Sequence, residues 1–226
     1  MKSSIESNLS EYKKGAIIGI SQTILGHPLD TLKIWRQNGN NSKLLLNSKL
    51  KTNFRNLFRG VSYPFILSIG YNSFLFGFYS KLKQESYSSL EAGVFSGSIL
   101  GILLNPFEYY KIQRQTKINK TISLFPFRGL HYTILRESIS CGVYFSSYEY
   151  FTQNLGISSF IAGGISGCSS WAITYPIDTV KTRFQANPSF GGKYYIQQGN
   201  LWKGIGFCLL RAFLVNGVSF TLYEMM

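Results

Sequence analysis

One ten-residue pattern occurs three times in this chain, and it constrains the fold more than any other feature. The copies read PLDTLKIWRQ from Pro28, PFEYYKIQRQ from Pro106 and PIDTVKTRFQ from Pro176. In each copy an acid follows the proline by two residues, a lysine by five and a glutamine by nine. A pattern that recurs three times along a sequence predicts a chain built from copies of one structural unit. The expected repeats span residues 1–87, 88–155 and 156–226.

Other features keep register with the decapeptides. Two glycines four residues apart precede each proline, and such small faces let membrane helices approach closely. These glycines are Gly15 and Gly19, Gly93 and Gly97, and Gly163 and Gly167. An aromatic residue, a base and a glycine follow each decapeptide, ending at Gly60, Gly129 and Gly204. A tyrosine then follows each of these glycines, at Tyr79, Tyr148 and Tyr223.

The composition indicates a membrane protein. The chain has 23 Lys+Arg against 10 Asp+Glu, a formal charge of +13, and 45% apolar residues. A soluble nucleic-acid binder of this charge would spread its bases along a surface, whereas here long segments have none. We therefore expect a lipid bilayer, and no nucleic acid, as the partner. Six segments are at least as long as the ~20 residues that a helix needs to cross a bilayer. They are Lys13–Arg36, Val61–Leu82, Ala92–Arg114, Leu130–Thr152, Ile157–Arg183 and Ile205–Met226.

The charges between these segments predict the topology. No acid occurs between Asp30 and Glu85, between Glu108 and Glu137, or between Asp178 and Glu224, although each interval contains bases. Lys and Arg accumulate on the electrically negative side of a membrane. The loops after the odd-numbered segments are therefore expected on that side. An even number of spans then leaves both termini together on the other side.

The sequence offers little support for an enzyme. It contains no Gly-rich phosphate loop, no His/Cys cluster with metal-ligand spacing and no nucleophile with a base and an orienting group. We expect no catalytic residue, cofactor or metal. The odd number of cysteines argues against a disulfide framework.

The three decapeptides resemble the P-x-[DE]-x-x-[KR]-x-[KR]-x-Q motif of the mitochondrial carrier family, and the resemblance covers essentially the whole chain. The second base of the motif is in place only as Arg183. The resemblance implies an all-α membrane protein with six tilted transmembrane helices in three pseudo-threefold repeats around a central cavity. It implies a monomer in the mitochondrial inner membrane, with both termini on the intermembrane-space side, that transports a small-molecule substrate by alternating access.

The resemblance also gives the polar residues of the decapeptides a role as a gate on the matrix side. The implied ion pairs are Asp30 with Lys111, Glu108 with Lys181, and Asp178 with Lys33. Below them would lie the bracing glutamines Gln37, Gln115 and Gln185. The prolines Pro28, Pro106 and Pro176 would kink the helices, because proline disrupts a helix interior. The alternative is that these charges only cap helices at the membrane surface. Charges at membrane depth cost ~2.5–3.5 kcal/mol each on insertion scales, which favours paired charges and a gate.

A second gate, on the cytoplasmic side, is implied at the ends of the even-numbered helices. Its residues would be Tyr79, Lys83, Tyr148, Glu149, Tyr223 and Glu224. Only Lys83 and Glu149 are expected to form an ion pair there, while the tyrosines donate hydrogen bonds. Interfacial anchoring is an alternative role for the tyrosines. Gly60, Gly129 and Gly204 are expected to open helices whose free N–H groups bind the phosphates of cardiolipin.

The expected substrate contacts lie seven residues after each of these glycines, at Leu67, Arg136 and Arg211, with Glu137 beside Arg136. A charge inside a membrane span is a functional candidate by default. The planar fork of arginine suits a carboxylate or a phosphate. Adjacent helical residues point in different directions, so we do not expect Arg136 and Glu137 to pair with each other.

An adjacent Arg-Glu resembles carriers of amino acids, carnitine esters and S-adenosylmethionine, above all the ornithine, basic amino acid and carnitine branch. The expected substrate is therefore a zwitterion of this kind, with the arginines on its anionic part and Glu137 on its cationic part. The alternative is a nucleotide or deoxynucleotide, with phosphates on the arginines and Tyr71, Phe74 or Tyr144 against the base.

Overall fold

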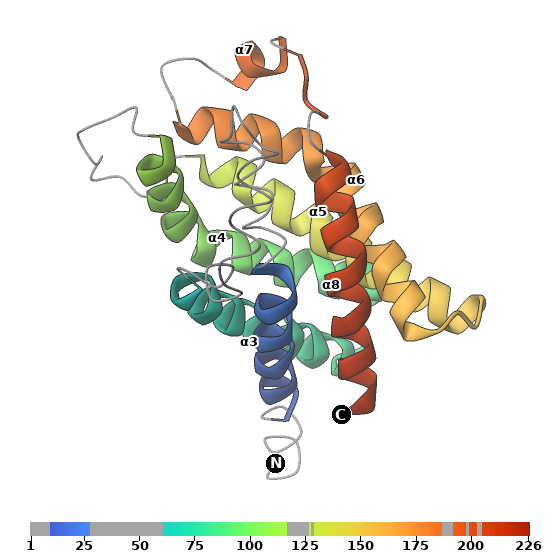
Figure 1. Ribbon diagram of the computed structural model, residues 1–226. Coiled ribbons are helices and arrows are strands. Elements are labelled where there is room, and N and C mark those ends of the chain that lie inside the picture. Colours follow the sequence, from blue (N-terminus) through green and yellow to red (C-terminus); the bar gives the residue numbers. More distant parts are fainter. Residues whose placement is uncertain are drawn as a thin grey trace, which may run out of the picture.

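The structure is a computed structural model, and the regular secondary structure of the residues that it describes is helical (Figure 1). These are residues 10–27, 61–116, 127, 129–186, 192–197, 199–202 and 205–226. Besides a helix over 10–27, they form α3 (Ser62–Gln84), α4 (Ser89–Thr116), α5 (Leu130–Glu149), the π-helical turn η2 (Tyr150–Asn154), α6 (Ser159–Ala186), α7 (Gly192–Gln197) and α8 (Ile205–Met225). No strand occurs among them, which confirms the expected all-α class.

The long helices follow the predicted segments closely. α4 and α6 continue through Pro106 and Pro176, whereas Pro28 lies outside the described residues. The expected repeat boundaries fall in the connection between α3 and α4 and in the one between η2 and α6. By length and composition, one described segment, Ser89–Tyr109, is apolar and long enough to cross a membrane.

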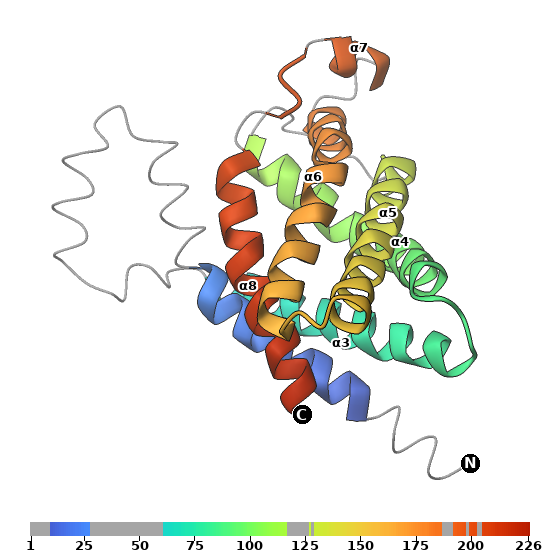
Figure 2. The ribbon, with the colours of Figure 1, turned by 90° about the vertical axis from the view of Figure 1, so that its right-hand side faces the viewer.

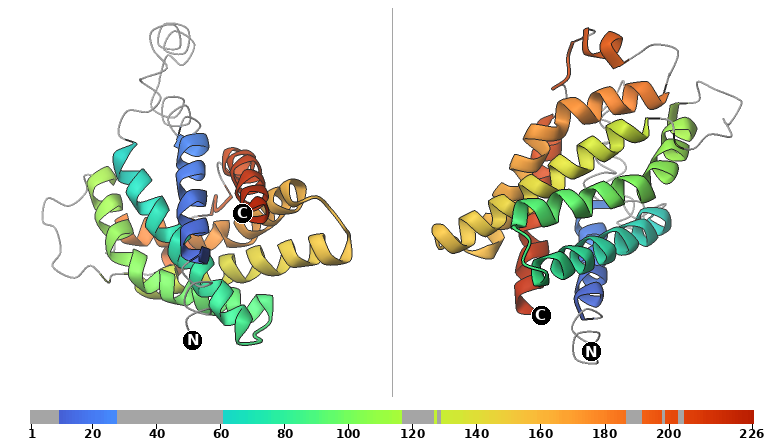
Figure 3. Two further views of the ribbon diagram at one scale, coloured as in Figure 1. Left: turned by 90° about the horizontal axis from the view of Figure 1, so that it is seen from below. Right: turned by 180° about the vertical axis from the view of Figure 1, so that it is seen from behind.

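The six long helices form a closed ring in chain order. α3 contacts α4, α4 contacts α5, α5 contacts α6, and α6 contacts α8. Helix 10–27 closes the ring on both sides, because Ser68 of α3 donates a hydrogen bond to the Gly19 carbonyl and Gln22 donates one to Ser219 of α8. The left view of Figure 3 shows helix 10–27 beside α8.

The start of helix 10–27 and the end of α8 lie at one end of the ring, where Tyr223 donates a hydrogen bond of 2.7 Å to Glu11. α7 lies at the opposite end (Figures 1 and 2). Arg183 of α6 holds that region with hydrogen bonds of 3.1 Å to the carbonyls of Tyr195 and Gly199. The second base of the third decapeptide thus fastens the connection after α6 to α6 itself.

Paired glycines bring the helices of each repeat into backbone contact. A Cβ added at Gly19 would meet the backbone of α3 at Ser68, and one added at Gly97 would meet the backbone of α5 at Glu137. At Gly163 it would come within 2.8 Å of the Asn216 carbonyl of α8. The close approach predicted from the glycine pairs is confirmed.

Aromatic side chains fill the ring toward the end that holds the termini. Tyr79 stacks on Phe145 with ring centroids 3.7 Å apart, and Tyr148 stacks on Phe220 at 3.4 Å. These rings belong to, or pack against, one buried cluster that also includes Phe76. Stacked and edge-on ring contacts add to the burial of apolar area, so the helices meet here around a packed interior.

Substituting the glycines at the helix contacts should destabilise the protein. We expect Gly97→Ala to lower the midpoint of thermal unfolding in detergent, because overpacking a tight contact costs about 1–3 kcal/mol. Gly70→Ala in α3 is the matched control, since an added Cβ there meets nothing within 4 Å. It should leave the midpoint unchanged or raise it, because alanine favours a helix over glycine by ~1 kcal/mol. Equal midpoints for the two variants would contradict the packing argument.

Candidate functional site

A cavity of about 380 Å³ lies inside the ring, and all six long helices contribute to its wall. Leu67, Arg136, Glu137 and Arg211, the four residues expected to contact substrate, all line it. Glu108 of the expected gate lines it as well. The volume falls within the ~300–1,000 Å³ typical of small-molecule sites.

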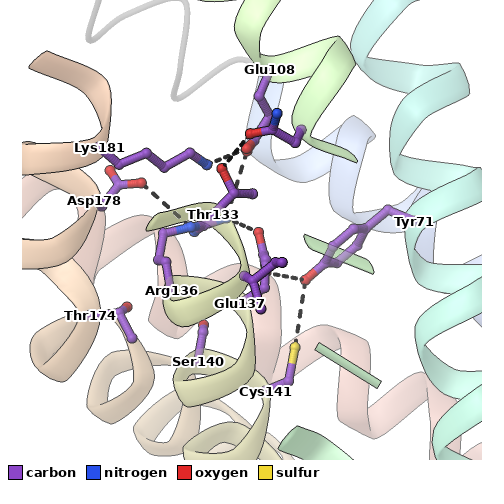
Figure 4. A network of polar contacts seen from close by, with 12 residues as sticks. Tyr71, Glu108, Thr133, Arg136, Glu137, Ser140, Cys141, Thr174, Asp178 and Lys181 are labelled. Atoms are coloured by element: carbon purple, nitrogen blue, oxygen red, sulfur yellow. Dashed lines mark hydrogen bonds and ion pairs between the residues drawn. The ribbon is translucent and has the colours of Figure 1, made fainter. Parts of the chain in front are cut away.

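Arg136 of α5 is the centre of a charged cluster in the cavity wall (Figure 4). Its guanidinium pairs with Glu137, its Nη2 lies 3.7 Å from Oε1 of Glu108 on α4, and its Nε lies 3.6 Å from Oδ1 of Asp178 on α6. The Trp171 ring faces the guanidinium, with 5.9 Å between Arg136 Cζ and the ring centroid. One arginine therefore links three acids that belong to three helices.

The pairing of Arg136 with Glu137 corrects the expectation that adjacent residues would not meet. The two Cα–Cβ bonds do point apart, but an arginine side chain is long enough to turn back along the helix. Glu137 is 1% exposed, and a buried carboxylate is costly unless a cation or hydrogen bonds compensate it. Tyr71 of α3 also donates a hydrogen bond of 3.4 Å to Glu137. Burial thus selects the Arg136 conformer that reaches the neighbouring acid.

The Glu108–Lys181 pair expected for the matrix-side gate is formed, with Nζ of Lys181 donating to the Glu108 carboxylate. Lys181 is 2% exposed, so the pair lies inside the ring. The other predicted pairs fall on positions that the structure does not describe. Asp30, Lys33 and Gln37 are outside the described residues, and for Lys111 and Gln115 only the backbone is described.

Gln185 was expected to brace the gate. Its described hydrogen bond joins it to Asn105 of α4. Its Nε2 donates to Oδ1 of Asn105 on α4 at 3.1 Å, and Thr133 of α5 donates to the same oxygen at 2.8 Å. All three side chains are fully buried. Asn105 precedes Pro106, so this contact ties α4, α5 and α6 together beside the proline.

Toward the end of the ring that holds the termini, Lys83 and Glu149 form the expected ion pair, with Nζ 3.2 Å from Oε2. Tyr148 donates a hydrogen bond of 2.5 Å to Glu224, which Ser159 also contacts. Tyr223 donates to Glu11, as described above. Two of the three expected tyrosines thus act as hydrogen-bond donors, while the Tyr79 ring stacks in the aromatic cluster.

Uncharged polar residues complete the wall. Asn72 donates a hydrogen bond of 3.0 Å to Gln22, and Tyr144 donates one of 3.2 Å to Asn216. These bonds join neighbouring helices around the cavity and give its surface donors and acceptors beside the charges. Among the described residues, no three or more His, Cys, Asp or Glu side chains form a group that could hold a metal ion.

Sequence reasoning missed several of these residues. Glu11 and Ser159 lie near the helix starts and belong to no repeated motif. Asn105 differs from the residues that precede the other two prolines, His27 and Tyr175. The register of the repeats could have drawn attention to Trp171, because it lies on the decapeptide helix of its repeat and one turn before Tyr175. The proposed lipid positions Gly60 and Gly204 lie outside the described residues, and Gly129 is the N-cap of α5, with φ 76°.

Charged side chains of membrane helices that face the interior of a bundle are typical of substrate and ion pathways. A ring of helices around a charged cavity is therefore typical of the class of helical transporters.

Comparison with known proteins identifies the family. The family model described as "Mitochondrial carrier protein" matches residues 153–226. A mitochondrial arginine transporter of Arabidopsis thaliana is 30% identical to this chain, over 95% of this chain and 89% of the relative. A mitochondrial basic amino acids transporter of Rattus norvegicus is 28% identical, over 93% and 86%. The mitochondrial ornithine transporter 1 of Schizosaccharomyces pombe is 23% identical, over 97% and 92%. The chain belongs to the mitochondrial carrier family, as its motifs predicted.

Exchanging the charges of Lys83 and Glu149 tests the ion pair at the end of the ring that holds the termini. Lys83→Glu and Glu149→Lys, made singly, each place like charges opposite one another and should lower the thermal midpoint. The double variant should recover most of the loss. Both side chains are about a third exposed, so the effect should be modest, on the order of 0.2–1 kcal/mol. Losses that simply add in the double variant would show that the two residues do not interact.

Proposed function

We propose that the protein carries a basic amino acid, such as arginine, lysine or ornithine, across the mitochondrial inner membrane by alternating access. The proposal includes six membrane-spanning helices in three related repeats, a monomer, and both termini on the intermembrane-space side. It also includes cardiolipin bound at the helix starts near Gly60, Gly129 and Gly204. Family membership supports the transport class, and the names of the relatives support the substrate class.

The observation that carries the substrate proposal is the presence of both kinds of charge in one cavity. Arg136 and Arg211 offer guanidinium groups to a carboxylate, which arginine can bind through two parallel hydrogen bonds. Glu137 and Glu108 offer carboxylates to a cationic side chain or an α-ammonium group. A basic amino acid has charges of both signs and can satisfy both sets at once.

The same cluster disfavours the nucleotide alternative. Glu108, Glu137 and Asp178 surround Arg136, and like charges placed together cost binding energy. A phosphate approaching this arginine would face three carboxylates and, unlike a basic amino acid, would bring no cation to offset them. None of the three relatives described above is named as a nucleotide transporter.

The two ends of the cavity provide the contacts that alternate. Glu108 with Lys181 would hold the matrix side closed, and Lys83 with Glu149 would hold the cytoplasmic side closed together with Tyr148 and Glu224. Each state is populated according to the contacts that stabilise it. Transport would proceed as substrate binding weakens one set while the other remains.

Uptake into liposomes tests this function. Purified protein should accumulate labelled arginine, lysine or ornithine above protein-free liposomes, with exchange stimulated by internal substrate. Carnitine, S-adenosylmethionine and nucleotides complete the panel, because the sequence also permits them. Accumulation of one of these three without any basic amino acid would overturn the proposed substrate class.

Neutralising Glu137 should impair transport of a basic amino acid. We expect Glu137→Gln to lower arginine uptake about tenfold or more, since a hydrogen bond to a charged group contributes ~1.5–3 kcal/mol. Glu85→Gln is the control, because Glu85 is exposed in the turn after α3. It should transport like the parent. Unchanged uptake by Glu137→Gln would remove this acid from the binding site.

A further inference from the structure

Arg136 belongs to two structures at once. It lines the cavity in which the substrate is proposed to bind, and it contacts Glu108 and Asp178, two acids of the decapeptide motifs. Glu108 is also the partner of Lys181. Figure 4 shows Arg136 between Asp178 and Glu137, with Glu108 and Lys181 above. One side chain therefore connects the cavity directly to the ion pair that joins α4 to α6.

The geometry of these contacts leaves them open to exchange. The Arg136 nitrogens are 3.7 Å from Glu108 and 3.6 Å from Asp178, beyond the ~2.7–3.2 Å of an N–H···O hydrogen bond. The guanidinium attracts both acids, but it donates a pair of parallel hydrogen bonds to neither. A substrate carboxylate could accept two parallel hydrogen bonds from it, and would then be the better partner.

We infer that Arg136 couples substrate binding to opening between α4 and α6. A substrate carboxylate takes the guanidinium, so Asp178 and Glu108 lose the cation that draws them together. The cationic side chain of the substrate compensates the negative charge left at Glu108, the one of these two acids that lines the cavity. The Glu108–Lys181 pair then stands without this support. The inference rests on the proposed function, because it requires a substrate with both charges.

The two charges of the substrate thereby have different tasks. The cation of the substrate gives it affinity for the acids. The carboxylate causes the opening between α4 and α6, because a ligand shifts a conformational equilibrium only when it binds the two states differently. A decarboxylated analogue should therefore occupy the cavity and leave Arg136 in place. It should inhibit transport without being transported.

Arginine and its decarboxylated analogue agmatine test this in the unaltered protein. In liposomes, agmatine should compete with labelled arginine, while labelled agmatine itself enters about tenfold more slowly or less. Agmatine uptake at a rate within roughly threefold of arginine would overturn the coupling role. The comparison needs no variant, so it stands even where a substitution impairs folding.

Substituting Arg136 separates coupling from binding. Lysine keeps the positive charge but loses the planar fork. We expect Arg136→Lys to lower the maximal rate of arginine uptake about tenfold or more, with the agmatine inhibition constant within roughly threefold of the parent. Retained inhibition would show that the cavity is intact. A maximal rate equal to that of the parent would overturn the inference.

Arg211→Lys is the matched control, because Arg211 occupies the corresponding position of the third repeat on α8, whereas the three acids around Arg136 belong to α4, α5 and α6. It should raise the KM for arginine more than it lowers the maximal rate. Identical behaviour of the two lysine variants would overturn the specific role of Arg136. Absence of uptake of arginine, lysine and ornithine by the parent would instead refute the proposed function, and the coupling inference with it.

Discussion

The backbone contacts at the paired glycines are the constraint on which the rest of the structure depends. Gly19, Gly97 and Gly163 leave no room for a Cβ against the partner helix. Helices held this closely cannot rotate independently. The polar positions of the two helices in each repeat are therefore fixed relative to one another, and each repeat presents its charges to the shared cavity from a fixed position. Between membrane helices, where burial from water gives little driving force, such packing is a main source of association.

The distribution of charge then breaks the threefold pattern. The position seven residues after the repeated glycine is Leu67 in the first repeat and arginine in the second and third. Only Arg136 is followed by an acid. The second repeat consequently contributes most of the charged cluster, and the first contributes Tyr71, which donates to Glu137. A repeated scaffold with one charged segment can hold a substrate in a single orientation.

Much of the fold was predictable, because the helix boundaries and glycine contacts follow from repeated local patterns. The Glu108–Lys181 and Lys83–Glu149 pairs could also be named, from the resemblance to the carrier family. The Arg136–Glu137 contact could not, since it depends on how deeply Glu137 is buried and on the acids of α4 and α6 that surround the arginine. The contacts of Asn105 and Glu11 could not be predicted for a related reason. Each has a role that arises only from a neighbour distant in sequence, and neither repeats.

Arg183 links α6 of the third repeat to the segment that follows it in the chain. Its guanidinium spans from α6 to the carbonyls of Tyr195 and Gly199, so α6, α7 and the turn that follows α7 form one lever. The equivalent positions of the first two decapeptides are Trp35 and Gln113. These side chains have no guanidinium group. A tilt of α6 would therefore displace α7 at the surface of the protein.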